Sequence, residues 1–465
     1  MANPPALLRL RRSRRPRVAD PELELADIQG NILRPYGFQH ACFLFVHVDE
    51  AAAGRRWLAE RTDEVTSAEP WEQGKPLTTL NIRLTYPGLE ALGVPESMLA
   101  SFPEAFRAGM AGRAALLGDI GPNSPAEWEH GLGTGEAHIL LRIDSQEPDA
   151  LTQEVNRLRQ SVEGVGSIVT EQYSAFLPSG RNHFGYVEGA GAVAVLGAGV
   201  PSHRGEGVPE PRDEWRPVKP GEFILGYEDE DNELPDAPDE PLGRNGTYMV
   251  YRKFSMDVAR FTNFLRDAAG ALMDGDEELL AAKIMGRWRD GTPLVLSPDR
   301  PDPELAADPA RVDDFRYGSD LEGLACPLGA HIRRANPRDA LGWHGALSLR
   351  QRMIRRGVSY GPPPEDPAVD DGLDRGLVFT CFVANIERQF ETVQTGWIND
   401  GNVFGLGTDK DFLLGGEDPA GKMTIQGDPP RFVSPQPAFV RVRGGEYLFQ
   451  PGISALRAIA AGISA

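Results

Sequence analysis

The chain has 465 residues, of which 41% are hydrophobic and 25% charged, and its 48 Lys and Arg against 68 Asp and Glu leave a net charge of −20. This length accommodates two to three domains' worth of structure, and the composition is that of an ordinary globular protein. The acidic balance disfavours nucleic acid and anionic membrane surfaces as partners, because both are bound by basic surface.

The first twenty residues form a basic segment. Residues 1–20 contain no acid before Asp20, and their paired arginines are not followed by an apolar stretch of signal-peptide length. We therefore expect a disordered tail rather than a twin-arginine export signal. No later segment approaches the roughly 18 apolar residues of a membrane span, so no membrane partner is predicted.

Three cysteines occur, Cys42, Cys326 and Cys381, and they are far apart with no C-x-x-C pair. Their spacing indicates neither a disulfide framework nor a zinc site. Such sparse use of cysteine suits a reducing compartment, and the predicted location is cytoplasmic.

Four segments share one pattern, a short apolar strand followed by an amphipathic helix. The predicted strands are residues 41–48, 137–144, 247–254 and 376–384. Ser255 and Asn385 are predicted N-caps where a strand gives way to a helix. A final amphipathic helix is expected in the last residues of the chain. Apolar residues recur at helical spacing after the second and fourth strands, at Leu151, Val155, Leu158 and Val162 and at Ile386, Phe390, Val393 and Trp397.

Two strand–helix units in each half predict an α+β fold of two ferredoxin-like modules, each an antiparallel sheet with helices packed on it. Residues 21–212 are assigned to the N-terminal module and residues 247–465 to the C-terminal one. Residues 213–246 between them are rich in Pro, Gly and acids and are predicted to form a linker or long loop.

One histidine has a setting that suits a cofactor. His331 lies in "CPLGAHIRRANPRD" beside several arginines, among them Arg334. A haem requires this combination, because an imidazole Nε2 binds the iron and guanidinium groups meet the propionates. On spacing alone, a hydrogen-bonded surface histidine is the commoner outcome. The histidines form no H-x-x-x-H or H-E-x-x-H motif, and the chain has no phosphate-loop or G-x-S-x-G motif.

Two further segments carry candidate groups. "RQRMIRRGVSYGPP" (351–364) contains Arg352, Arg355 and Arg356, which are either solvated or include one that turns inward to stabilise charge on a ligand. "HFGYVEGAG" (183–191) sets Glu188 among glycines, including Gly185 and Gly189, which allow the backbone to approach a ligand closely.

Together these segments resemble the dye-decolourising peroxidases, a haem-peroxidase family. The resemblance extends from residues 27–46 to residues 439–457 and includes "NHFGYVEG", "GEFILGY", "CPLGAHIRRANPR", "MIRRGVSYG" and "GLVFTCFVANIERQF". It implies haem b bound between two ferredoxin-like modules. It also implies oxidation of phenolic, dye-like or other aromatic donors by hydrogen peroxide through an oxo-iron(IV) intermediate. A homo-oligomer is left open.

The resemblance also assigns roles. His331 is similar to the proximal iron ligand, Arg355 to the distal arginine, and Leu377 and Phe379 to apolar residues above the haem. Arg334, Gly185 and Gly189 are further expected to contact the cofactor. Glu188 stands where the family's G-x-x-D-G motif has aspartate, and we expect it to be catalytic together with Arg355.

Glutamate at position 188 leaves three outcomes. The free pKa values are similar, near ~4.3 for glutamate and ~3.9 for aspartate, so the extra methylene matters more than basicity. In the first, Glu188 reaches the peroxide and carries a proton from one of its oxygens to the other. In the second, it swings away and leaves Arg355 to polarise the peroxide. In the third, it fills space over the iron and suits another chemistry. We expect the first. The alternative function is a haem-binding or haem-handling protein, which carries haem or releases its iron with little peroxidase turnover.

Overall fold

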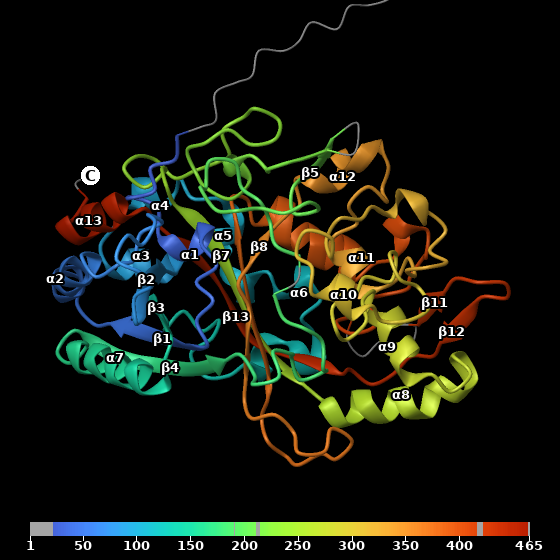
Figure 1. Cartoon of the computed structure of the whole chain (residues 1–465). Helices are drawn as coiled ribbons and strands as arrows, with labels where there is room; N and C mark the ends of the chain where they lie inside the picture. Colours follow the sequence, from blue (N-terminus) through green and yellow to red (C-terminus); the bar gives the residue numbers. More distant parts are fainter. Residues whose placement is uncertain (1–21, 190, 211–213, 416–421, 464–465) are drawn as a thin grey trace, which may run out of the picture.

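A nine-stranded antiparallel sheet, made of two halves joined edge to edge, runs through the molecule (Figure 1). The computed structural model describes residues 22–189, 191–210, 214–415 and 422–463, so the predicted basic tail at residues 1–20 lies outside the described residues. The strands of the N-terminal half are β1 (His40–Val48), β2 (Thr78–Leu84), β3 (Ile139–Ser145) and β4 (Gly166–Ala175). Those of the C-terminal half are β7 (Thr247–Met256), β8 (Ile354–Arg355), β9 (Val358–Tyr360), β10 (Gly376–Val383) and β13 (Val440–Gln450).

Both halves have the same strand order. The N-terminal half runs β4-β1-β3-β2 and the C-terminal half β13-β7-β10-β8, with β9 also paired to β10. Numbered along the chain within each half, both orders read 4-1-3-2, which is the ferredoxin-like arrangement. The halves meet where Leu84 on β2 pairs with Phe449 on β13. The predicted fold class, two ferredoxin-like modules, is confirmed.

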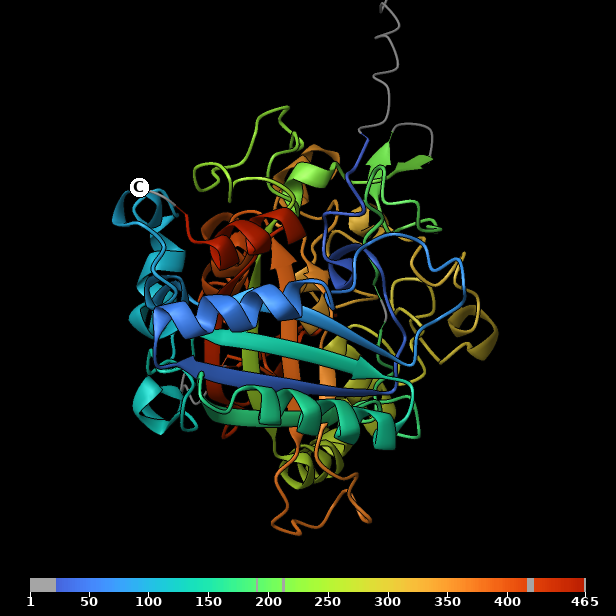
Figure 2. The same cartoon turned by 90° about the vertical axis from the view of Figure 1, so that its left-hand side faces the viewer.

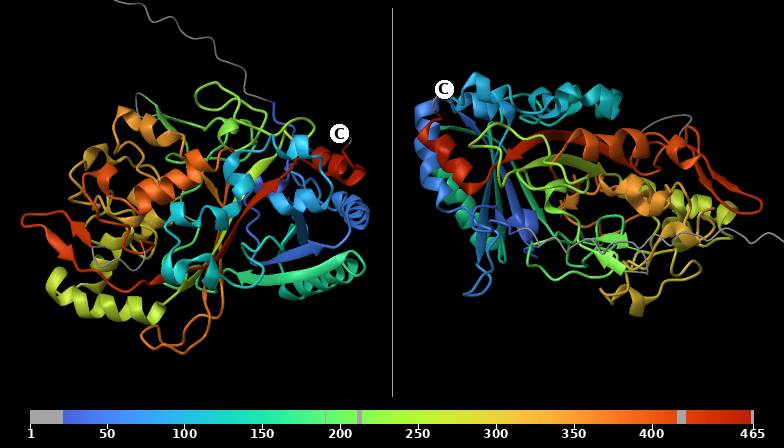
Figure 3. Two further views of the ribbon diagram at one scale, coloured as in Figure 1. Left: turned by 180° about the vertical axis from the view of Figure 1, so that it is seen from behind. Right: turned by 90° about the horizontal axis from the view of Figure 1, so that it is seen from above.

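Helices α2 (Ala51–Thr62) and α7 (Pro148–Ser161) lie against the N-terminal sheet (Figure 2). The side chains predicted to form the buried stripe of α7 are buried, including Val155 and Leu158. The C-terminal helix α13 (Ile453–Ala461) was also expected, and it packs on α2 (Figure 3). Helix α13 was assigned to the C-terminal module, residues 247–465, but it packs against a helix of the N-terminal module.

The helices of the C-terminal module differ in part from expectation. Helix α8 (Val258–Leu272) is capped by Asp257, whose side chain accepts a hydrogen bond from the Arg260 amide, and the predicted cap Ser255 lies within β7. The Ser255 prediction is wrong because β7 continues to Met256. After β10 the chain forms two π-helical segments, Glu387–Glu391 and Val393–Ile398. Asn385 accepts from the Arg388 amide at 2.8 Å, so this predicted cap is confirmed.

The segment predicted as a linker holds the buried Glu222, which forms ion pairs with Arg350 and Arg388.

The remaining strands and helices are short. Two small hairpins are β5 (Val208–Glu210) with β6 (Glu214–Arg216) and β11 (Met423–Ile425) with β12 (Arg431–Val433). The other α-helices are α1 (Gly30–Leu33), α3 (Tyr86–Ala91), α4 (Glu96–Leu99), α5 (Glu104–Gly112), α6 (Ala114–Leu117), α9 (Glu277–Met285), α10 (Pro303–Ala306), α11 (His331–Ala335) and α12 (Ala346–Leu349).

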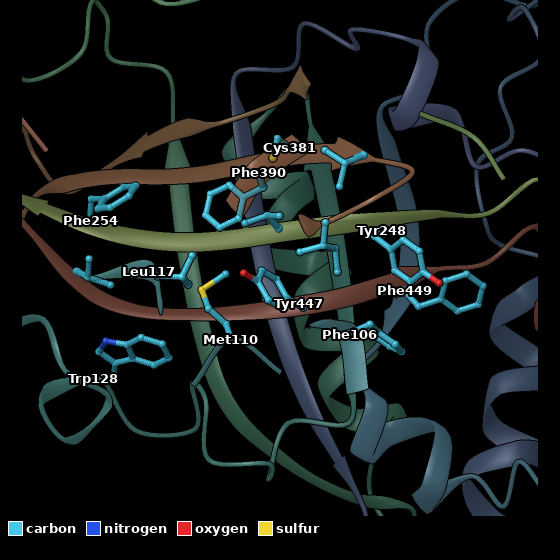
Figure 4. Packing of buried hydrophobic residues seen from close by; sticks show 14 of the residues in the cluster. Phe106, Met110, Leu117, Trp128, Tyr248, Phe254, Cys381, Phe390, Tyr447 and Phe449 are labelled. Carbon is cyan, nitrogen blue, oxygen red and sulfur yellow. The ribbon is translucent and has the colours of Figure 1, made fainter. Parts of the chain in front are cut away.

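The sheet separates two hydrophobic cores. Alternate residues of β1 belong to different clusters, Leu44 and Val46 to one and Phe43 and Phe45 to the other, because side chains alternate across a strand. The larger cluster continues along β7, β10 and β13, and the Phe390 ring, after β10, lies 6.1 Å from that of Tyr447 (Figure 4). None of the helices within the described ranges is both long and apolar enough to cross a membrane.

Candidate active site

One face of the C-terminal sheet collects the residues predicted to lie above a haem. Arg355 pairs with Cys381 and Ser359 pairs with Leu377 across neighbouring strands. Directly opposed residues share a face, and so do residues two apart on one strand. Arg355, Ser359, Leu377 and Phe379 therefore project to the same side. Leu377 and Phe379 are half-buried although their neighbours Val378 and Thr380 are fully buried, so this face is the more open one.

Glu188 is attached to this face through Ser359. The Ser359 hydroxyl donates to Glu188 Oε1, and Oε2 is buried with no hydrogen-bond partner among the described residues. Burial raises the pKa of Glu188 and the Ser359 hydrogen bond partly offsets that shift. The carboxylate thus has one oxygen held in place and one available.

Glycines shape the loop that carries Glu188. Gly185 has a φ of +88° and Gly189 a φ of +82°, in the left-handed region that side chains disfavour. Gly191 follows, and its amide donates to the buried Asp313 at 3.2 Å. The glycines predicted from the motif are therefore needed for the path of the backbone.

Arg355 reaches the same loop. Its Nη2 donates to the Gly191 carbonyl at 2.9 Å, and burial lowers its pKa while the negative charge of Asp313 opposes that shift. The side chain is nevertheless accessible to solvent. Arg355 is thus surrounded by protein and still accessible, as expected of a side chain that faces an internal space. Arg355 is thus bonded to the loop that carries Glu188, and the Glu188 carboxylate itself accepts from Ser359.

His331 begins α11 and is oriented by an acid 80 positions further on. Its Nδ1 lies 2.9 Å from Oδ2 of Asp411, whose side chain is fully buried. The other oxygen of Asp411 accepts from the amides of Leu413 and Leu414. Burial by itself would raise the pKa of Asp411, but the His331 and Arg334 charges lower it below its usual value. A carboxylate on Nδ1 fixes the ring and leaves Nε2 to bind a metal, as is usual for histidine ligands.

Arg334 has a different position from the one that a propionate contact suggests. It is fully buried, and its guanidinium donates to the carbonyls of Gly329, Trp397 and Asp409, with a longer contact to Asp400. These bonds tie α11 to the segment that leads to Asp411. Its contact with the cofactor stays a prediction.

His183, next to the glycine loop, forms a hydrogen bond through Nε2 with the Tyr360 carbonyl at 2.7 Å. Burial lowers its pKa, which favours the neutral ring. It therefore connects the loop that carries Glu188 to the end of β9.

The residues present fit a haem. His331 offers a nitrogen oriented by a buried carboxylate, and the sheet face offers two apolar side chains and a guanidinium. The loop bonded to this face adds the Glu188 oxygen that has no partner in the described part of the chain. The segment after β10 contacts both parts of the site. The ring of Phe390 lies 6.4 Å from that of Phe379, and the Trp397 carbonyl accepts from Arg334.

Comparison with known proteins agrees with this geometry. The family described as the DyP dimeric alpha+beta barrel domain matches residues 27–175. A dye-decolorizing peroxidase of Mycena epipterygia is 31% identical over 99% of this chain and 91% of its own. The chain belongs to the dye-decolourising peroxidase family. A solved dye-decolorizing peroxidase in complex with 2,6-dimethoxyphenol has a TM-score of 0.81 and 29% identity over 94% of this chain and 100% of its own.

The peroxidase is thus a haem-dependent oxidoreductase. A deferrochelatase of Yersinia pestis is 34% identical but matches only 24% of this chain and 21% of its own. Full-length similarity to peroxidases therefore favours peroxidase activity over the haem-handling alternative.

Proposed function

We propose that the peroxidase binds haem b through His331, and uses Glu188 and Arg355 to reduce hydrogen peroxide while phenolic, dye-like or other aromatic donors are oxidised. Bound haem supplies the iron that takes electrons from these donors and passes them to peroxide. The observation that carries the proposal is a pair of differently held groups at one sheet face, the Arg355 guanidinium and the Glu188 oxygen for which the described residues provide no partner.

Each residue of the site has a separate role in the proposed reaction. Glu188 Oε2 has no hydrogen-bond partner among the described residues and lies on a carboxylate held by Ser359, so it can accept a proton from peroxide and return it to the departing oxygen as water forms. Arg355, fixed by the Gly191 carbonyl, stabilises negative charge that develops on the oxygens. Leu377 and Phe379 keep bulk water from this face. Asp411 holds the imidazole of His331 in one orientation.

Replacing the two catalytic side chains tests this proposal. In Glu188→Ala and Arg355→Ala, the peroxide-dependent change in the Soret spectrum should slow by about two orders of magnitude in stopped-flow mixing. Glu188→Asp should retain most of the rate, because it restores the carboxylate. Glu136→Ala, at a half-exposed carboxylate in the N-terminal module, is the matched control. An unchanged rate in Glu188→Ala would show that Glu188 does not transfer the proton.

Replacing the ligand tests the haem site separately. His331→Ala should lose haem occupancy, seen as a lost Soret band with an unchanged far-ultraviolet circular dichroism spectrum. A haem carrier would keep the Soret band in the parent protein but show little turnover of an aromatic donor with peroxide.

The proposal includes a cytoplasmic location, supported by three cysteines that are unpaired and buried. Cell fractionation checks the location, and sedimentation at several concentrations decides whether the peroxidase is a homo-oligomer.

A further inference from the structure

Two sulfur atoms lie on the sheet face that carries Arg355. Met353 comes directly before β8, and the Cys381 thiol on β10 donates to its thioether sulfur at 3.6 Å. Cys381 pairs with Arg355 across the two strands. Ile354, between Met353 and Arg355 in the chain, packs into the cluster on the other side of the sheet. Met353, Cys381 and Arg355 therefore share one face.

Met353 also contacts the opposite part of the proposed haem site. Its side chain is half-buried and packs against both the large core cluster and a small cluster of Val393, Trp397 and Ile398. The carbonyl of Trp397 accepts a hydrogen bond from Arg334, which lies on the same helix as the proposed iron ligand. Met353 is therefore placed between the two parts of the site, where peroxide is used.

The two sulfur atoms differ in how easily peroxide oxidises them. A thiol reacts as the thiolate, and burial raises the pKa of Cys381 although the positive charge of Arg355 opposes that shift. The fully buried Cys381 thiol is therefore protonated and inert. A thioether has no proton to lose, so the Met353 sulfur is a nucleophile at any pH. Met353, which is also the more accessible of the two, is the one that we expect to react.

We propose that Met353 is an oxidation site, at which hydrogen peroxide that exceeds the supply of aromatic donor converts the thioether to a sulfoxide and lowers the activity of the peroxidase. The sulfur attacks one oxygen of peroxide, so that an S–O bond forms and the O–O bond breaks. The proton on the transferred oxygen passes to the departing hydroxide, which leaves as water. The sulfur is oxidised by loss of an electron pair, and peroxide is reduced by gaining it.

Arg355 makes this methionine more reactive than others. Negative charge develops on the departing oxygen as the O–O bond breaks, and a guanidinium on the same face stabilises that charge. This inference rests on the proposed function, because that function brings peroxide to Arg355. Oxidation lowers activity because a polar sulfoxide replaces an apolar side chain where Met353 packs between the two parts of the site.

The position of the added oxygen is the first test. The haem-loaded peroxidase is exposed to hydrogen peroxide without a donor, and its peptides are analysed by mass spectrometry. Met353 should gain one oxygen atom at least about tenfold faster than Met98, which is also half-buried but lies on α4 of the N-terminal module. Equal rates at the two methionines, or oxygen added to Cys381 instead, would overturn the proposal.

The role of Arg355 is tested in the same experiment. In Arg355→Ala, the ratio of the Met353 rate to the Met98 rate should fall by about tenfold. Arg159→Ala, which removes an arginine from an ion pair of the N-terminal module, is the control and should leave the ratio unchanged. An unchanged ratio in Arg355→Ala would overturn the part that this arginine plays in the oxidation.

The Soret change separates this inference from the proposed function. A parent protein whose Soret spectrum responds quickly to peroxide, but whose Met353 is oxidised no faster than Met98, would overturn the oxidation site alone. A Soret response that Arg355→Ala leaves unchanged would instead overturn the proposed function.

The effect on activity is the last test. Met353→Leu removes the sulfur and keeps an apolar side chain of similar size. During exposure to peroxide without a donor, its activity should decline at least about threefold more slowly than that of the parent, each compared with its own starting rate. Met98→Leu is the matched control and should decline like the parent. A Met353→Leu protein that declines as fast as the parent would overturn the proposed loss of activity through this residue.

Discussion

At the scale of single residues, the site residues that lie within motifs could be predicted from the sequence. The residues that form hydrogen bonds with them could not. His331, Arg355 and Glu188 stand in recognisable segments, but Asp411 is 80 positions from His331 and lies in no motif that marks it. Ser359 follows Arg355 by four residues in a segment read for its arginines, and only the pairing of β9 with β10 places it near Glu188.

Ser359 allows a pH test of Glu188. Glu188 accepts a proton only when ionised, so the peroxide reaction should slow as the pH falls through its pKa. Because burial raises that pKa, the slowing should begin above the usual range of a glutamate. Ser359→Ala removes the hydrogen bond that favours the charged form and should move this limb to higher pH by roughly one unit. The rate of the Soret change measured from pH 3 to 8 checks this.

Ser145→Ala is the control for the Ser359 variant. Ser145 is also fully buried, but its hydroxyl donates to backbone carbonyls instead of a carboxylate, and it lies in the N-terminal module. Its pH profile should match that of the parent. A profile in Ser359→Ala that shifts to lower pH, or not at all, would show that Glu188 is not the titrating base.

At the scale of elements, the four strands could be predicted from the sequence, but the residue at which β7 gives way to α8 could not. β10 was predicted at residues 376–384 and spans Gly376–Val383, because an unbroken apolar run is typical of a strand buried on both faces. The start of α8 depended on whether Ser255 or Asp257 ends the strand, and both are good caps by type. Pairing of β7 with β13 as far as Met256 decides it, and that partner strand lies far away in the sequence.

The cap of α8 leads to a prediction about the stability of the protein. Asp257→Ala should destabilise the protein by about 1 kcal/mol, because the Arg260 amide loses its acceptor and a negative charge leaves the start of α8. Ser255→Ala should have a smaller effect, since Ser255 makes no cap. Chemical unfolding of both variants measures the difference. A larger loss in Ser255→Ala would contradict the assigned cap.

At the scale of the whole molecule, two similar modules could be predicted from repeated strand–helix units, but the way the ends of the chain join them could not. Helix α13 follows the last strand of the C-terminal module and packs on α2 of the N-terminal one (Figure 3). The Ile453 amide donates to the Asp27 carbonyl, and Gln29 donates to the Pro451 carbonyl. These contacts join the two ends of the described chain beside the junction of β2 with β13, so α13 belongs to both modules in energetic terms.

Leu456 makes that coupling testable. Its side chain is fully buried on α13, so Leu456→Ala should cost about 2–5 kcal/mol through lost burial and the cavity left behind. If α13 stabilises both modules together, unfolding followed by tryptophan fluorescence and by the Soret band should shift to lower denaturant by the same amount. Arg457→Ala, at an exposed neighbour on the same helix, should leave both curves within about 0.5 kcal/mol. A Soret transition that stays in place while the fluorescence transition moves would mean that the haem-binding module is stable without this contact, and that the shared sheet edge alone does not couple the two halves.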